Sequence, residues 1–193
     1  MRRIATFFSG LILSFIILSY GTYASDPRGV ELVYSQYQQT IFAQHQVGTN
    51  LASPIILTAT QYSAVSDPSI FHNYNNQLYW NGDEGWVEFQ VEVTEPGLYN
   101  IALTYLPLTD HIFNIERGIQ VNGEYQFAEA QRVVLNRQWR NNVYPFQRDE
   151  FGNEVRSFQE QVFEWQTTRI SDANGKYSQP FQWYFDQGTH TVR

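Results

Sequence analysis

The residues best suited to ligand chemistry lie in one polar stretch, residues 138–161, which is rich in Asn and Arg. Flat aromatic rings pack on the apolar face of a sugar ring, while amide, carboxylate and guanidinium groups hydrogen-bond its hydroxyl edge. The pattern therefore predicts a ligand-binding loop. The alternative is structural, with the aromatic ring packed beneath the loop and the arginines paired with nearby acids. The candidate ligand-binding residues are Trp139, Arg140, Asn141, Tyr144, Arg148, Asp149 and Asn153.

The same stretch contains a weak calcium signal. Four oxygen-bearing side chains within six positions surround Gly152 and would supply part of a calcium site. Their spacing matches no EF-hand loop, so a solvated acidic turn is the alternative interpretation. We expect no other cofactor and assign no metal ligands. The four side chains are those of Asp149, Glu150, Asn153 and Glu154.

Little in the chain indicates catalysis. The four histidines are scattered, and neither a Gly-x-Ser-x-Gly elbow nor a His-Glu-x-x-His motif occurs. The absence of cysteine excludes disulfides, thiolate catalysis and cysteine zinc sites. A carboxylate pair for glycoside hydrolysis stays open, because 19 Asp and Glu residues always allow some pair. We assign no catalytic residue.

Other aromatic and charged residues have structural alternatives. Trp80, Trp165 and Trp183 are candidates for the core. Trp86 falls out of phase with the buried positions of the strand that follows it, which places it on the solvent face or at a strand end. The neighbours Glu116 and Arg117 form either a ligand clamp or a structural ion pair.

The charge balance disfavours two classes of partner. Twelve Lys and Arg against 19 Asp and Glu give a net charge of -7, which argues against a nucleic acid or an anionic lipid surface. Aromatic residues make up 17% of the chain, an unusual surplus that needs a structural or a binding role.

The N-terminus has the features of a secretory signal peptide. Arg2 and Arg3 precede an apolar run, Phe7–Leu18, and small residues lead up to a cleavage site after Ala24. An uncleaved membrane anchor is the alternative, but the run is shorter than the roughly 20 residues that span a bilayer. We expect residues 1–24 to be removed, leaving a secreted protein without a membrane span.

Residues 25–53 are predicted to form a helical segment and a linker. Val33, Tyr37, Ile41 and Gln44 recur at helical spacing within Glu31–Gln44. A short amphipathic helix is therefore expected ahead of the strands.

Residues 54–193 are predicted to form a β-domain. Apolar residues alternate with polar ones from Val87 to Val93, which is typical of a strand with one buried face. The turn Glu95–Gly97 then leads into a second apolar segment, Leu98–Tyr105, and we expect the two strands to pair.

Further short strands follow the same logic. Asn122-Gly123 between apolar positions predicts a hairpin, and Asp172–Gly175 predicts a turn. Residues 138–161 are expected to be a long irregular excursion. The fold predicted is mainly β, an antiparallel sandwich or jelly roll with a short N-terminal helix. The other expected strands are Ile55–Ala59, Val133–Leu135, Phe163–Ile170 and Phe181–Phe185.

A last extended segment begins at Thr189 and stops with the chain at Arg193. A sandwich that lacks a closing strand would leave unpaired backbone groups and an uncovered core. We therefore expect a C-terminally truncated domain, with the last strand or strands missing.

An ordered succession of short motifs, spanning roughly Ile55 to Arg193, resembles a module at the N-terminus of certain bacterial extracellular solute-binding proteins of sugar ABC transporters. The chain differs from that module's pattern at Ser157, Gln161 and Phe163. The motifs are Gly85–Phe89, Glu95–Ile101, Tyr105–Leu108, Ile115–Arg117, Val121–Gly123, Phe127–Ala130, Arg137–Trp139, Arg148–Asp149, Gly152–Glu154, Arg156, Gln159, Trp165, Pro180–Gln182 and Gly188–Thr191.

The resemblance implies a galactose-binding-domain-like β-sandwich, as in carbohydrate-binding modules, and a C-terminal solute-binding domain beyond this chain. The leading hypothesis is a secreted, non-catalytic carbohydrate-binding module of a sugar uptake system, extracellular or associated with the cell surface. Its expected partners are carbohydrate and a solute-binding domain or transporter permease. The alternatives are an interaction module with no ligand of its own and a small polysaccharide lyase or hydrolase.

Overall fold

A computed structural model describes residues 32–45, 54–82, 84–108 and 112–193. All of these except Leu32 belong to one compact unit, Val33–Arg193. The predicted signal peptide, residues 1–24, lies outside the described residues, as do parts of the predicted segment 25–53. None of the described helices has the length and apolar character needed to cross a bilayer.

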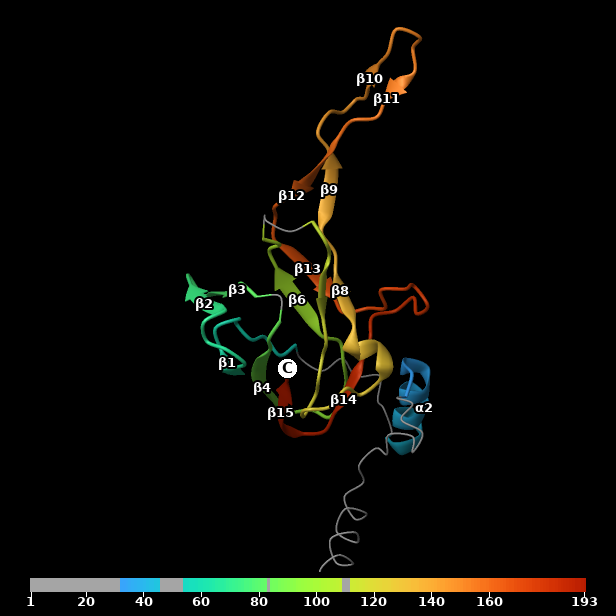
Figure 1. The fold of residues 1–193 in the computed structure, drawn as a ribbon. Helices are drawn as coiled ribbons and strands as arrows, with labels where there is room; N and C mark the ends of the chain where they lie inside the picture. Colours follow the sequence, from blue (N-terminus) through green and yellow to red (C-terminus); the bar gives the residue numbers. More distant parts are fainter. Residues whose placement is uncertain (1–31, 46–53, 83, 109–111) are drawn as a thin grey trace, which may run out of the picture. The chain divides into compact units, whose positions relative to one another are not determined.

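The prediction of a mainly-β, antiparallel fold with a short helix ahead of the strands is confirmed (Figure 1). The helical elements are α2 (Tyr34–Gln44) and the 3-10 turn η1 (Ala128–Gln131). The strands are β1 (Tyr62–Val65), β2 (Phe71–Tyr74), β3 (Gln77–Trp80), β4 (Val87–Val93), β5 (Gly97–Tyr99), β6 (Ala102–Tyr105), β7 (Ile115–Arg117), β8 (Val133–Leu135), β9 (Gln138–Asn141), β10 (Gln147–Arg148), β11 (Glu154–Val155), β12 (Gln159–Val162), β13 (Gln166–Arg169), β14 (Trp183–Phe185) and β15 (Gly188–Val192).

Helix α2 is part of the core. Tyr34, Tyr37 and Ile41 are its buried residues, and they lie on one face because they follow the helical repeat. Two hydrogen bonds attach this face to the strand region: the hydroxyl oxygens of Tyr34 and Tyr37 accept main-chain N–H groups of Gln182 and Tyr184. The predicted helix is confirmed.

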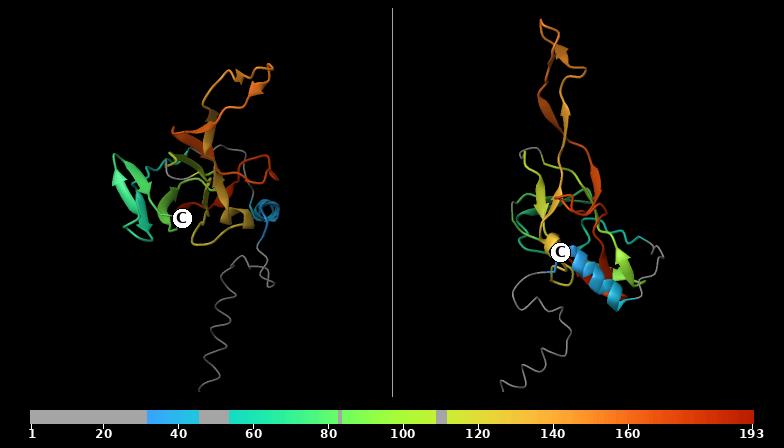
Figure 2. Two further views of the ribbon diagram at one scale, coloured as in Figure 1. Left: turned by 45° about the horizontal axis from the view of Figure 1, so that its top comes forward. Right: turned by 90° about the vertical axis from the view of Figure 1, so that its right-hand side faces the viewer.

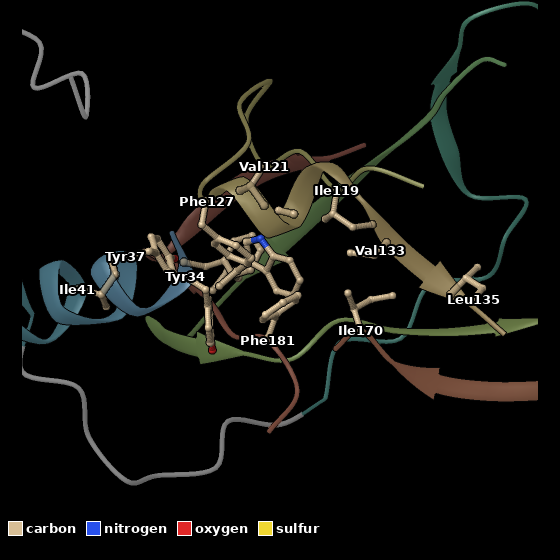
Figure 3. Packing of buried hydrophobic residues seen from close by; sticks show 14 residues of the cluster. Tyr34, Tyr37, Ile41, Ile119, Val121, Phe127, Val133, Leu135, Ile170 and Phe181 are labelled. Carbon is tan, nitrogen blue, oxygen red and sulfur yellow. The ribbon is translucent and has the colours of Figure 1, made fainter. Parts of the chain in front are cut away.

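Six of the 14 buried residues that the structure describes in the core cluster are aromatic (Figure 3). The ring of Phe127 lies 4.8 Å from Tyr34, 5.2 Å from Tyr37, 5.1 Å from Phe181 and 5.3 Å from Trp183, measured between centroids. Tilted and edge-to-face pairs of this kind each add about 0.5–1.5 kcal/mol beyond the burial of their area. Packing here accounts for part of the aromatic surplus seen in the sequence.

Strand β4 is the centre of a three-stranded sheet, with β1 on one side and β15 on the other. The predicted pairing of Val87–Val93 with Leu98–Tyr105 is therefore wrong, because both edges of β4 are occupied. The second segment instead forms two strands with other partners: β5 pairs with β14, and β6 with β13. The turn at Glu95–Gly97 carries the chain from one sheet to another.

The predicted strand at Ile55–Ala59 is also wrong. The side chains of Ile55, Ile56 and Leu57 are exposed, and the first strand begins later, at Tyr62. β-Branched composition favours a strand only where the side chains have a surface to pack against. That surface exists for β1, whose Val65 is opposite Val87 of β4.

The Asn122-Gly123 turn forms as predicted. Both residues have positive φ, 54° and 83°, and Val121 bridges Glu124 across the turn. This turn also borders β15, since Val121 bridges Val192. Strand β15 thus has hydrogen-bonded neighbours on both sides.

The prediction of an irregular excursion at residues 138–161 is wrong. This segment forms an antiparallel ladder, β9 with β12, which continues into the smaller pair β10 and β11 (Figures 1 and 2). We call residues 138–162 the arm. Every residue of the arm is described and none is buried, so neither face shows the apolar alternation by which a strand is recognised in a sequence.

Candidate functional site

The register of β9 and β12 divides the arm into two faces of different chemistry. Trp139 is opposite Gln161, and Asn141 is opposite Gln159. Because side chains alternate along a strand, these four share one face, which we call the amide face. Neighbours on such a face are about 5 Å apart across the ladder and about 7 Å apart along it. The amide face therefore combines one indole ring with three uncharged amides.

The opposite face of the ladder is ionic. Arg140 is opposite Glu160, and its Nε donates to the Glu160 carboxylate at 2.7 Å. Both side chains are largely exposed, so the pair contributes at most about 1 kcal/mol to stability. The structure places Arg140 away from Trp139 and gives it the structural role that was the alternative in the sequence.

Asp149 organises the turn at the tip of the arm. Its Oδ1 accepts the main-chain N–H groups of Phe151 at 2.9 Å and Asn153 at 2.8 Å, and its Oδ2 accepts the Asn153 side-chain amide at 3.1 Å. These bonds, led by the Asn153 side chain, lower the pKa of the Asp149 carboxyl below its ordinary value. Gly152, with φ of 82°, completes the turn.

Two carboxylates at the tip, those of Asp149 and Glu154, have partners within their own loop. Asp149 already accepts three hydrogen bonds, and Glu154 lies beside Arg148 at 3.9 Å. Within the described part of the chain, no group of three or more His, Cys, Asp or Glu side chains is arranged to hold a metal ion. The residues of the weak calcium signal therefore fit a hydrogen-bonded turn better than a coordination shell.

Tyr144 lies between the ladder and the tip. Its ring is 81% exposed and makes an edge contact with Phe146, 5.7 Å between centroids. Next to it, a hollow of about 190 Å³ lies between the two pairs of strands, lined among others by Asn142, Val143 and Phe158.

The structure thus brings some of the predicted residues together and separates others. Trp139 and Asn141 share the amide face, whereas Arg148, Asp149 and Asn153 belong to the tip. Gln159 and Gln161 on the amide face were missed by sequence reasoning. Their spacing of two was a signal, but it has meaning only once β12 is known to pair with β9.

The remaining tryptophans differ in burial. Trp183 is fully buried in the core, as expected. Trp80 and Trp86 are partly buried, and the guanidinium of Arg193 lies 3.9 Å above the Trp86 ring. Trp165 is 52% exposed, so the expectation that it belongs to the core is wrong.

Glu116 and Arg117 do not form the ion pair suggested by their adjacency. Glu116 instead receives two hydrogen bonds from Arg132, of which the Nε–Oε2 bond is 2.9 Å long. The Arg132 hydrogen bonds lower the pKa of the Glu116 carboxyl. The guanidinium of Arg117 lies 4.0 Å above the ring of Trp80.

The chain matches no protein-family model, and neither a curated protein nor a solved structure matches it. Fold and site together define a mainly-β protein of antiparallel ladders. Its particular feature is an arm with one aromatic and amide face and one ionic face.

Proposed function

We propose that the protein is a secreted, non-catalytic carbohydrate-binding module and that the amide face of its arm is the binding surface. The observation that carries the proposal is the register of β9 and β12, which gathers Trp139, Asn141, Gln159 and Gln161 on one face and sends the Arg140–Glu160 pair to the other. The indole ring, with its residue 41% exposed, offers a platform for the apolar face of a sugar.

The surrounding amides suit the hydroxyl edge of the same sugar. Each amide carries both donors and an acceptor, as a hydroxyl does, so Asn141 and Gln159 match hydroxyl groups in either direction. Because the charges lie on the opposite face, binding here would depend little on ionic strength.

The resemblance of the sequence supports the wider setting of the proposal. In that setting the unit is a galactose-binding-domain-like sandwich joined to the solute-binding protein of a sugar ABC transporter. The signal-peptide pattern of residues 1–24 supports secretion.

A second candidate function is an interaction module without a ligand of its own. Three aromatic residues of the arm, Tyr144, Phe151 and Phe158, are each at least 80% exposed. Single exposed apolar residues are common on protein surfaces, but three within one short arm need an explanation. Such side chains favour contact with a protein partner, for example a following solute-binding domain.

The test is a glycan array probed with the purified chain and with two variants of the ladder. Trp139→Ala removes the platform, and Glu160→Gln, on the opposite face of the same ladder, is the matched control. The proposal expects at least one glycan to be bound, with binding weakened at least about tenfold by the first variant and unchanged by the second. Binding of no glycan would contradict the proposal and favour the interaction module. Equal binding by all three proteins would contradict the assignment to the amide face and place the glycan site elsewhere on the protein.

A further inference from the structure

A polar hollow lies over the β7–β8 pair. Glu116 of β7 is opposite Val134 of β8, and the alternation places Arg132 and Asn136 on the same face. The other face of the pair packs on the core through Val133 and Leu135. The hollow has a volume of about 290 Å³, and the loop 171–174 forms its other wall.

Two of the three charged groups that line this hollow, Glu116 and Arg132, are paired with each other. Arg132 donates to both carboxylate oxygens of Glu116, so the two side chains present a joint surface of donors and acceptors rather than a free charge. Beside them, the Asn114 amide donates to Oδ1 of Asn136 at 3.2 Å. The Nδ2 group of Asn136 and the Nη1 group of Arg132 take part in none of these contacts.

The loop wall is held in shape by Asp172. Its carboxylate accepts the main-chain N–H groups of Asn174 at 3.0 Å and Tyr177 at 3.2 Å, and also that of Lys176. The carboxylate is thus engaged within the loop, while Ala173 and Asn174 line the hollow. A wall that is already ordered loses little conformational entropy when a ligand binds.

We propose that this hollow binds a single neutral sugar residue, either a free monosaccharide or the end of a glycan. Its volume lies at the small end of ligand pockets, which run from roughly 300 to 1,000 Å³, and suits one ring rather than a chain. Paired charges and amides match hydroxyl groups, and Val134 gives the ring an apolar contact. An anionic ligand would be repelled, because the carboxylates of Glu116 and Asp172 outnumber the single guanidinium of Arg132.

This inference deepens the proposed function and rests on it, since it adds a second carbohydrate site to the same protein. The two sites differ in kind. The amide face contains an aromatic platform, whereas the lining of the hollow contains none. Binding in the hollow therefore depends on hydrogen bonds, and a site built on hydrogen bonds rejects ligands that fail to complete them.

The experiment is an NMR titration of the purified chain, in which the side-chain amide signals of Asn136 and Asn174 report on the hollow. The probes are D-galactose, D-glucose and L-arabinose, with D-galacturonate and D-galactosamine as charged counterparts. We expect at least one neutral sugar to shift both amide signals with a dissociation constant of about 1 mM, and the anionic counterpart, D-galacturonate, to bind at least about tenfold more weakly.

Two variants make the assignment specific. Ala173→Trp, at an exposed loop position, fills the hollow without touching the core, and Asn136→Ala removes amide donors. Each variant should weaken the binding of the monosaccharide at least about tenfold, while Trp139→Ala should leave this binding unchanged. Absence of any amide shift with the neutral sugars, equal binding of D-galacturonate and the neutral sugars, or unchanged binding by Ala173→Trp would overturn the inference.

The two proposals fail separately. In the first case, Trp139→Ala abolishes glycan binding on the array and the titration detects no monosaccharide binding. The amide face is then supported as the binding surface, and the proposal for the hollow is contradicted. In the second case, the monosaccharide binds and Trp139→Ala does not change glycan binding on the array. The proposal for the hollow is then supported, and the proposal for the amide face is contradicted.

Discussion

The hydroxyl oxygen of Tyr37 accepts a hydrogen bond from the main-chain N–H of Tyr184 at 2.8 Å, across 147 positions of sequence. Tyr34 forms the equivalent bond with Gln182 at 2.9 Å. Both rings also pack against Phe127. Helix α2 is therefore fixed to the β14 region by polar and apolar contacts at once.

Tyr37→Phe tests the polar part of this attachment. The variant keeps the ring but removes the acceptor for the Tyr184 N–H, so the free energy of unfolding should fall by about 1–2 kcal/mol. Urea denaturation measures the change. Gln39→Ala, on the exposed side of the same helix, is the control and should stay within about 0.5 kcal/mol of the parent. Equal stability of parent and Tyr37→Phe would show that the bond contributes nothing.

Phe127→Ala tests the aromatic core. The ring is 1% exposed and contacts four other aromatic rings, so truncation should cost about 3–5 kcal/mol through lost burial and a residual cavity. Phe127→Leu keeps most of the volume and should cost less than half as much. Thermal unfolding followed by near-UV circular dichroism checks both values. Equal costs for the two variants would contradict a packing origin.

A pair of glycines separates backbone strain from steric contact. A Cβ at Gly123 or at Gly97 would meet no atom within 4 Å, but only Gly123 has positive φ, 83°. Gly123→Ala should therefore lower the free energy of unfolding by about 1–2 kcal/mol, while Gly97→Ala should change it by less than about 0.5 kcal/mol. Chemical denaturation of the two variants in parallel measures both changes in the free energy of unfolding. Equal losses of stability would contradict an origin in backbone strain.

The turn at Asp149 should weaken in acid. Its hydrogen bonds, first those from Asn153, lower the carboxyl pKa below the ordinary 3.8 in the folded state. A lowered folded-state pKa means that the stabilisation is present above the unfolded value and is lost as pH falls through the folded one. A carboxyl-carbon NMR titration should give a midpoint below 3.8, with the Asn153 amide signal following the same curve. A midpoint at or above 3.8 would contradict the bonded turn.

Shortening the arm separates the predicted site residues at its tip from those on the ladder. The Asn142 N–H donates to the Phe158 carbonyl at 2.9 Å, so residues 143–157 can be replaced by an Asn-Gly turn. Since no arm residue is buried, the free energy of unfolding should change by less than about 1 kcal/mol.

Glycan binding by the shortened chain gives the second result. The amide face remains, whereas the candidate residues Tyr144, Arg148, Asp149 and Asn153 are removed. The proposal expects array binding to persist in this variant. Its loss, with stability unchanged, would place the site at the tip instead.

Local patterns in the sequence predicted local structure well. The spacing of Tyr37 and Ile41 predicted the buried side of α2, and the alternation from Val87 to Val93 predicted β4. The Asn122-Gly123 pair predicted its turn, because positive φ at both positions suits these two residues.

Such patterns did not predict which strands pair when the partners are far apart in the sequence. The alternation of β4 shows that it is a strand but does not show that β15, rather than the segment after Glu95, pairs with it. In the arm, both faces are exposed to solvent, so no apolar period marked the strands. The separation of Trp139 from Arg140 becomes visible only when both are placed on one strand.

The position of β4 between β1 and β15 has a consequence for biosynthesis. Phe89 of β4 pairs with Val192 of β15, about 100 residues later in the sequence. Tyr37 and its partner Tyr184 are separated by 147 positions. Closing such distant contacts is slow, because chain entropy is lost before the contacts form. A nascent chain that has not yet released residues 181–192 exposes one edge of β4 and the apolar side of α2. Folding of this unit therefore cannot finish until those residues have left the ribosome.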